Sequence, residues 1–170
     1  MRTLLAGIAT ILLATPGLAQ TPNVADIPVA HIDDLGTPFD LKAHLYRPAG
    51  TGDVPLVLYI HGKGGSYNDP RDQVFKRVLA GMLSHGIAVA RMDYRRSGRL
   101  PQMLLAPQAS LRFFRAPARE YHLDPHRFGI WGVSRGGNLA AMLAVTGDVK
   151  ALEGDVGGNS AQSSLLQASV

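Results

Sequence analysis

The chain has 170 residues, of which 46% are hydrophobic and 18% are charged with both signs interspersed, so the composition excludes a disordered protein and allows one domain with a core. The formal net charge is +4, but the basic residues are scattered apart from the short clusters "RMDYRRSGR" and "RFFRAPAR", which disfavours a nucleic-acid partner. The sequence contains no cysteine, which excludes disulfides and thiolate metal sites.

Residues 1–19 have the features of a secretory signal peptide. Arg2 supplies a positive charge before an apolar stretch from Leu4 to Ala14, which is shorter than the roughly 20 residues that span a bilayer. Gly17-Leu18-Ala19 provides the small residues that a signal peptidase recognises. A buried core helix is the alternative, but the segment has no polar face. We therefore expect a periplasmic or secreted protein with no integral membrane segment after cleavage.

Beyond this segment the patterns alternate between strand and helix. "TPNVADIP" is polar and contains proline, so we expect residues 20–42 to form a linker and the first strand region. Residues 43–170 then predict an α/β domain with a mostly parallel sheet and flanking helices. The expected strands are 43–48, 54–62, 87–95 and 127–133, the expected helices are 70–86, 106–121 (interrupted by Pro117) and 136–145, and "LDPHR" is expected to be a turn.

The stretch "FGIWGVSRGG" places a serine between glycines where an expected strand meets an expected helix. Gly132-Val133-Ser134-Arg135-Gly136 fits the G-x-S-x-G pattern, in which a tight turn exposes a nucleophilic serine. Gly132 and Gly136 let the helix approach the strand without a Cβ clash, and the N–H of Arg135 is placed to bind an oxyanion. A glycine-rich nucleotide-binding turn is the alternative, but neither nucleotide-binding spacing fits.

A second glycine-rich stretch, "YIHGKGGSY", follows the expected strand at 54–62. Its N–H groups could form the other half of an oxyanion hole, with Lys63 and Gly64 as the donors. A phosphate-binding loop is the alternative, but Lys63 is followed by glycine and the required upstream glycine is missing. His61 precedes the serine and adjoins this loop, so we expect His61 and Gly62 to support the loop, with no role for His61 as a base.

The two stretches resemble the α/β-hydrolases of the HGGG-loop esterase group. The chain is most similar to the secreted bacterial feruloyl and acetyl-xylan esterase-like proteins of the BD-FAE type, through "HGKGG", "AVARMDYRRSG", "YHLDPHRFGIWGVSRGGNLAAMLA" and "TGDVKALEGDVGGNSAQSSLLQASV". The resemblance covers most of residues 54–170 and implies Ser134 as nucleophile, an oxyanion hole of backbone amides, and a structural turn at Asp93, Tyr94 and Arg95. Lys63 departs from the usual glycine, and Pro117 interrupts a helix that is normally continuous.

The base and carboxylate of the triad are not evident in the sequence. In this fold the triad order is serine, then Asp or Glu, then histidine. All six histidines precede Ser134, and the later carboxylates Asp148, Glu153 and Asp155 lie in an expected loop. The terminal "LLQASV" is typical of the start of a further buried strand. We therefore expect either the N-terminal portion of a longer esterase, which the intact serine turn favours, or a non-catalytic remnant.

The sequence thus predicts a carboxylic-ester hydrolase acting on small-molecule or carbohydrate esters, with neither a metal nor a cofactor. The alternatives are a serine peptidase of the prolyl-oligopeptidase type and a non-catalytic binding module of the same fold. The sequence pattern does not indicate which acyl and alcohol groups the substrate carries.

The export signal makes one prediction. Cleavage after Ala19 would give a mature chain that begins at Gln20. N-terminal sequencing or intact mass of the protein recovered from the exported fraction checks this expectation. Recovery of that protein with Met1 retained would contradict it.

Overall fold

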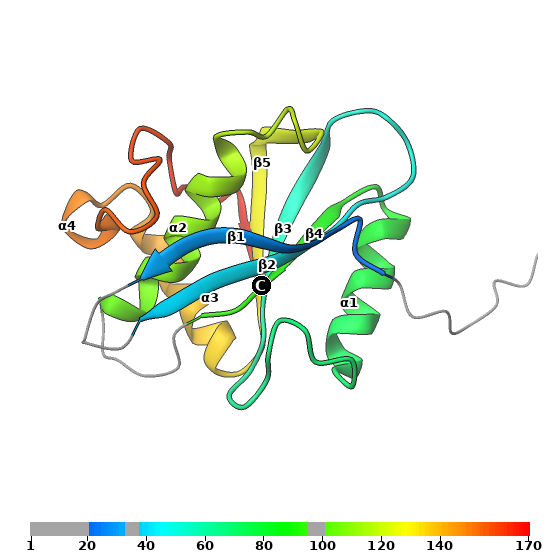
Figure 1. The fold of residues 1–170 in the computed structure, drawn as a ribbon, viewed down its shortest axis with the longest axis horizontal. Coiled ribbons are helices and arrows are strands. Elements are labelled where there is room, and N and C mark those ends of the chain that lie inside the picture. The colour runs from blue at the N-terminus through cyan, green and yellow to red at the C-terminus, as the bar shows by residue number, and fades with distance from the viewer. Residues whose placement is uncertain (1–20, 33–37, 95–100) are drawn as a thin grey trace, which may run out of the picture.

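The computed structural model describes residues 21–32, 38–94 and 101–170 (Figure 1). The expected signal peptide at 1–19 lies outside these residues, as do Arg95, Arg96 and Arg99 of the first basic cluster. None of the helices in the described residues has the length and hydrophobicity that a membrane span requires.

The described chain forms a mixed sheet in the order β1-β2-β4-β3-β5-β6. β3 pairs in parallel with β4 and β5, and β5 pairs in parallel with β6, whereas β1–β2 and β2–β4 are antiparallel. The strands are β1 (Val24–Ile32), β2 (Phe39–Tyr46), β3 (Val54–Ile60), β4 (Ala88–Met92), β5 (Leu123–Gly132) and β6 (Ala168–Ser169). The helices are α1 (Gln73–Ser84), α2 (Gln102–Arg115), α3 (Arg135–Thr146) and α4 (Lys150–Glu153).

The central strands are apolar on both faces because helices lie on both sides of the sheet (Figure 1). Leu56, Leu58 and Ile60 of β3 pack in a core with α2 and α3. Tyr59 of the same strand belongs to a second core, where it meets Phe75 of α1 with ring centroids 5.0 Å apart. The α/β architecture with flanking helices is as the sequence predicted.

The expected linker at "TPNVADIP" is wrong, because Val24–Ile32 forms β1. This strand has an apolar face, because Ile27, Val29 and Ile32 are buried against the core. Pro28 concealed this strand in the sequence, because proline has no backbone N–H to donate to a neighbouring strand. β1 tolerates Pro28 because it pairs on one side only, with β2, and has register irregularities between Val24 and Ile27 and between Pro28 and Ala30.

The second expected helix is displaced. The sequence predicts it over 106–121, but α2 covers Gln102–Arg115 and ends before Pro117. Pro107 lies inside α2 and is buried there, where it removes one backbone donor without ending the helix. Pro117 therefore lies beyond the helix instead of interrupting it.

Two further expectations need correction around β5. "LDPHR" lies within β5, although the turn chemistry is present: the Asp124 carboxylate accepts from the N–H of His126 at 2.9 Å. The partner of Val54 is Leu123 and that of Leu56 is Phe128, so the residues between are an irregularity in the strand. The segment "LLQASV" does lead into a parallel strand, β6, but both residues of that strand are exposed instead of buried.

Side chains of α2 hold the segment that connects α3 to β6. Arg112 has a side chain that is 2% exposed and lies 2.6 Å from Glu153 Oε2, and it also donates to the carbonyl oxygen of Val156 at 2.9 Å. Three positions further along, Arg115 donates to the carbonyl oxygens of Ser163 and Leu165. The buried Arg112–Glu153 pair contrasts with the solvent-exposed pair Arg127–Asp124.

This contrast predicts unequal effects on stability. Arg112→Met leaves the Glu153 carboxylate without its cation and should lower the free energy of unfolding by about 3 kcal/mol. Arg127→Met removes an exposed pair and should cost less than about 1 kcal/mol. Urea unfolding of both variants measures the difference, and the double variant Arg112→Met/Glu153→Gln should recover part of the loss. Equal effects of the two single variants would contradict the assignment.

Candidate active site

Ser134 lies in a strained turn between β5 and α3. It follows the last residue of β5 by two positions and directly precedes α3, and its backbone has φ 54° and ψ −112°. A positive φ is uncommon for a residue with a side chain and indicates a conformation imposed by the surrounding structure. The serine is exposed at this turn. The turn that the sequence predicted from the G-x-S-x-G spacing is therefore present.

The glycines on either side of Ser134 allow this turn to form. A Cβ atom built on Gly136 would lie 2.3 Å from the carbonyl oxygen of Ile60 at the end of β3. A Cβ atom on Gly132 would lie 2.1 Å from the carbonyl oxygen of Gly136. Neither position can hold a larger side chain without moving the backbone. The first turn of α3 can therefore pack directly on the ends of β3 and β5.

The glycine-rich loop after β3 lies beside this turn. A Cβ atom on Gly62 would be 3.6 Å from the Cβ of Ser134. The N–H of Gly65 donates to the carbonyl oxygen of Gly62 at 3.1 Å, and Gly64 has a φ of 81°, as expected for the third residue of a type II turn. The N–H groups of Lys63 and Gly64 donate to no acceptor within the part of the chain that the structure describes. Two unengaged donors thus lie on the loop next to the serine.

The buried side chain of His61 contacts both this loop and the residue that follows β4. Its side chain is 1% exposed, Nδ1 donates to the carbonyl oxygen of Gly62 at 2.8 Å, and Nε2 lies 3.1 Å from Oδ1 of Asp93. The ring also packs on Tyr94, with centroids 4.8 Å apart. Because both ring nitrogens are engaged, His61 cannot accept a proton from Ser134 without losing a contact. These contacts connect the loop after β3 to the residue that follows β4.

The His61–Asp93 pair follows from strand register. β3 and β4 are parallel, and Ile60 is paired with Met92. The residues that follow these two, His61 and Asp93, therefore leave the sheet side by side. The sequence predicts a structural turn at Asp93 but does not reveal this partner. An aspartate directly after one strand and a histidine directly after its parallel neighbour are the signal that could have identified the pair.

Charged and phenolic side chains that the sequence motifs do not include hold the rest of the loop. Arg91 of β4 is buried, lies 2.9 Å from Oδ2 of Asp72, and donates to the carbonyl oxygen of Asp69 at 3.0 Å. The Tyr67 hydroxyl donates to Oδ1 of Asp26 at 2.7 Å. Burial, together with this hydrogen bond, raises the pKa of Tyr67 to about 12. The loop is thus joined to both β1 and β4.

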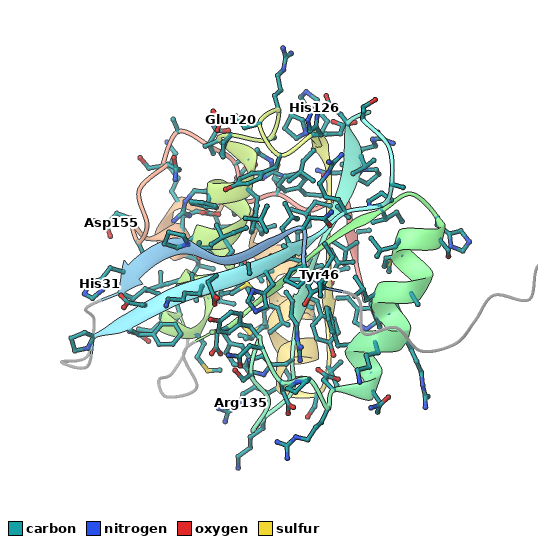
Figure 2. The ribbon with its side chains drawn as sticks, turned by 45° about the vertical axis from the view of Figure 1, so that its right-hand side comes forward. His31, Tyr46, Glu120, His126, Arg135 and Asp155 are labelled. Carbon is teal, nitrogen blue, oxygen red and sulfur yellow. The ribbon has the colours of Figure 1, made fainter. Side chains whose placement is uncertain are left out.

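Of the remaining histidines, His44 lies at the same end of the sheet as Ser134, because it pairs with Arg91 near the carboxyl end of β4. Its Nδ1 accepts from the N–H of Asp26 at 3.0 Å, and its ring packs on Tyr67. His85 precedes β4 and His122 precedes β5, whereas Ser134 follows the carboxyl end of β5. Figure 2 shows His126 at the opposite end of the molecule from Arg135, the neighbour of Ser134. His31 lies 2.6 Å from Asp40 on β1 and β2, both exposed.

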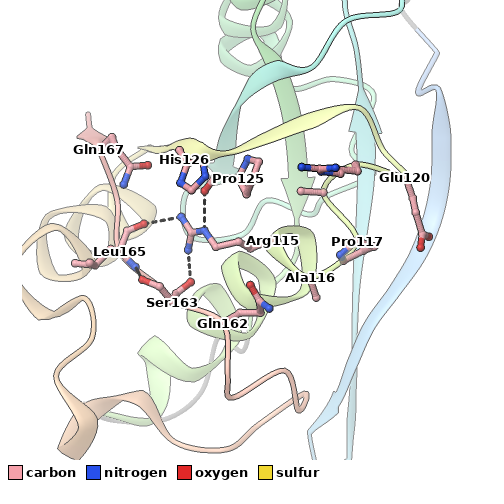
Figure 3. A pocket seen from close by; sticks show the side chains of 12 residues that line it. Arg115, Ala116, Pro117, Glu120, Pro125, His126, Gln162, Ser163, Leu165 and Gln167 are labelled. Carbon is pink, nitrogen blue, oxygen red and sulfur yellow. Dashed lines mark hydrogen bonds between the residues drawn. The ribbon is translucent and has the colours of Figure 1, made fainter.

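A cavity of about 620 Å³ also lies away from Ser134, and its lining residues are shown in Figure 3. Glu120 and His126 on its rim are at the end of the molecule opposite Arg135 (Figure 2). Arg115 lines it, but this guanidinium already donates to the carbonyl oxygens of Pro125 at 3.0 Å, Ser163 and Leu165 (Figure 3). Burial lowers the pKa of Arg115. The cavity is therefore separate from the serine turn.

The sheet, its helices and the serine turn together define an α/β-hydrolase fold. The BD-FAE family model matches residues 43–170, and the chain belongs to this family. It is 30% identical over 126 residues to "Carboxylic ester hydrolase LipN" of Mycobacterium tuberculosis, covering 68% of this chain and 33% of that protein. It is 32% identical over 124 residues to "Carboxylesterase NlhH" of the same species, covering 70% of this chain and 36% of that protein.

Solved structures agree on the fold. "Bifunctional GH43-CE" from Bacteroides eggerthii has a TM-score of 0.70 and 30% identity, covering 84% of this chain and 21% of that chain. The apo form of Thermogutta terrifontis esterase 2 has a TM-score of 0.68 and 22% identity, covering 92% of this chain and 57% of that chain. The chain spans about a third of the length of the curated relatives described above.

The glycine contacts predict which substitutions the turn tolerates. Gly136→Ala would place a Cβ 2.3 Å from the Ile60 carbonyl oxygen and should destabilise the protein by about 3 kcal/mol or more. Gly81→Ala is the matched control, because Gly81 lies inside α1 with nothing within 4 Å of the added Cβ. This control should stabilise by up to about 1 kcal/mol. The urea midpoints of both variants measure the effects, and a neutral Gly136→Ala would refute the close approach.

Proposed function

We propose that residues 20–170 form the nucleophile-bearing part of an exported carboxylic-ester hydrolase. The observation that carries the proposal is the placement of Ser134, exposed at a positive φ, beside a turn with two unengaged backbone donors. A strained serine next to free N–H groups is the arrangement that acyl transfer requires. The relatives named carboxylic ester hydrolase and carboxylesterase support the same activity.

In the proposed reaction, Ser134 Oγ attacks the carbonyl carbon of an ester. The carbonyl oxygen gains negative charge in the tetrahedral intermediate, and the N–H groups of Lys63, Gly64 and Arg135 stabilise that charge. Collapse of the intermediate breaks the bond to the alcohol and leaves an acyl-serine, which water then hydrolyses. Gly62 and His61 keep the turn in place and make no contact with substrate.

The proton of Ser134 needs a base that His61 does not provide. Both nitrogens of His61 are engaged, and no histidine follows Ser134 in the sequence. We place the base and its carboxylate outside these 170 residues, which is consistent with the share of the curated relatives that the chain spans. Alone, the chain should show only the residual catalysis that the oxyanion donors supply, which in other serine hydrolases is on the order of 10³ over water.

Modification of Ser134 by a fluorophosphonate tests the proposal. The probe phosphonylates an activated serine and releases fluoride, so the intact mass increases and peptide mapping locates the label. We expect the label on Ser134, with at least about tenfold less in Ser134→Ala, because the attacking oxygen is gone. Labelling is expected to be slow, since no base assists it.

Ser66→Ala is the matched control, because Ser66 lies on the neighbouring loop and its hydroxyl bonds to Asn68 Oδ1 at 2.8 Å. This variant should label like the unmodified chain. Equal labelling of Ser134→Ala and the unmodified chain would exclude Ser134 as the nucleophile. A panel of matched esters and peptides then separates the esterase from the peptidase of the same fold.

A further inference from the structure

Lys63 occupies the tip of the turn beside Ser134. It is the second residue of the turn that Gly62 and Gly65 close, and its side chain is exposed. The ammonium group makes no hydrogen bond or ion pair with any residue that the structure describes. A Cβ atom built on the adjacent Gly64 would meet nothing within 4 Å, so the space over the turn is open. Lys63 follows Gly62, whose built Cβ would lie 3.6 Å from the Cβ of Ser134, so the Lys63 side chain is long enough to reach a substrate bound at the serine.

Among the described residues, no carboxylate forms an ion pair with Lys63. Asp69 and Asp72 pair instead with Arg71 and Arg91. Asp26 accepts a hydrogen bond from the uncharged Tyr67 hydroxyl, and Asp93 lies against His61. Lys63 therefore presents its charge at the turn without an ion-pair partner.

One other feature adds positive potential at Ser134. α3 is 12 residues long and has no acidic residue in its first turn, so its positive dipole end faces the serine. Lys63 and the helix end act in the same direction.

We propose that Lys63 is a specificity-determining residue that favours esters carrying a fixed negative charge, such as a carboxylate or sulfonate, within a few ångströms of the scissile carbonyl. This inference rests on the proposed function, in which Ser134 is the nucleophile. One unit of charge at about 6 Å in a water-like dielectric changes a rate by about threefold. Lys63→Glu reverses the charge, a change of two units, and should therefore change the preference by about tenfold.

Two pairs of esters measure this preference, each matched except for charge. In 4-acetoxybenzenesulfonate and 4-acetoxybenzenesulfonamide the charge is on the alcohol part. In phenyl 4-sulfobenzoate and phenyl 4-sulfamoylbenzoate it is on the acyl part. In each reaction the Oγ–acyl bond forms, the aryl ester bond breaks, the phenol leaves and the serine proton passes to solvent. Peptide mapping of the full chain follows acylation at Ser134 and separates it from acylation of lysines.

The readout is the ratio of Ser134 acylation rates within a pair, anionic over neutral. Damage to the oxyanion donors cancels in this ratio, because both esters use the same donors. We expect Lys63→Glu to lower the ratio about tenfold and Lys63→Met about threefold in at least one pair. The effect should shrink in high salt, which screens exposed charges. Lys76→Glu is the matched control, since Lys76 is exposed on α1 and carries the same charge change; its ratio should stay within about twofold of the unmodified chain.

Unchanged ratios in both pairs for Lys63→Glu, with acylation still at Ser134, would overturn the role of Lys63 and leave the proposed function intact. An equal fall in Lys76→Glu would also overturn it, because the effect would then reflect net charge alone. Absence of acylation at Ser134 with every ester would instead overturn the proposed function, and this inference with it. The pair that responds identifies whether the alcohol or the acyl part carries the recognised charge.

Discussion

The site depends on a contact between two stretches of backbone. The first turn of α3 approaches the end of β3 so closely that no atom fits between Gly136 and the carbonyl oxygen of Ile60. Because the turn around Ser134 has to reach that position within two residues of the end of β5, the serine is held at a positive φ. The same contact places Ser134 beside Gly62, the second residue after the end of β3. Nucleophile and loop are therefore positioned by one packing constraint.

Parallel pairing extends this constraint to the polar residues. β4 pairs with β3 on the side away from β5, so the residue after β4 meets the residue after β3. His61 consequently receives Asp93 as its partner, and Arg91 within β4 reaches Asp72 at the start of α1. Each of these contacts joins the loop to the neighbouring strand. The loop has a defined shape despite its glycines because its polar side chains are fixed by the sheet.

The parts of this molecule that the sequence predicts are those whose cause is local. Buried parallel strands have continuous apolar runs, and the turn at Ser134 has glycines at fixed spacing, so both can be recognised from short stretches. β1 could not be recognised, because Pro28 suggests a loop and only the pairing with β2 shows that the edge position tolerates it. The roles of Arg91 and Tyr67 were not evident either, since their partners Asp72 and Asp26 are distant in sequence. "LDPHR" gave the right turn chemistry, but its position within β5 depends on the partner strand.

The arginines of α2 have a consequence for how the chain folds. Apart from that of Pro125, the carbonyl groups that Arg112 and Arg115 bind lie 41 to 50 residues further along the chain. The position of the segment between α3 and β6 therefore depends on contacts with α2, which precedes it in the sequence. Such distant contacts carry a loop-closure cost before they contribute stability, so they form after the local ones. β6 has two residues, both exposed, and pairs with β5 alone among the described strands, so it should be among the first elements to exchange its amide hydrogens when the native protein opens locally.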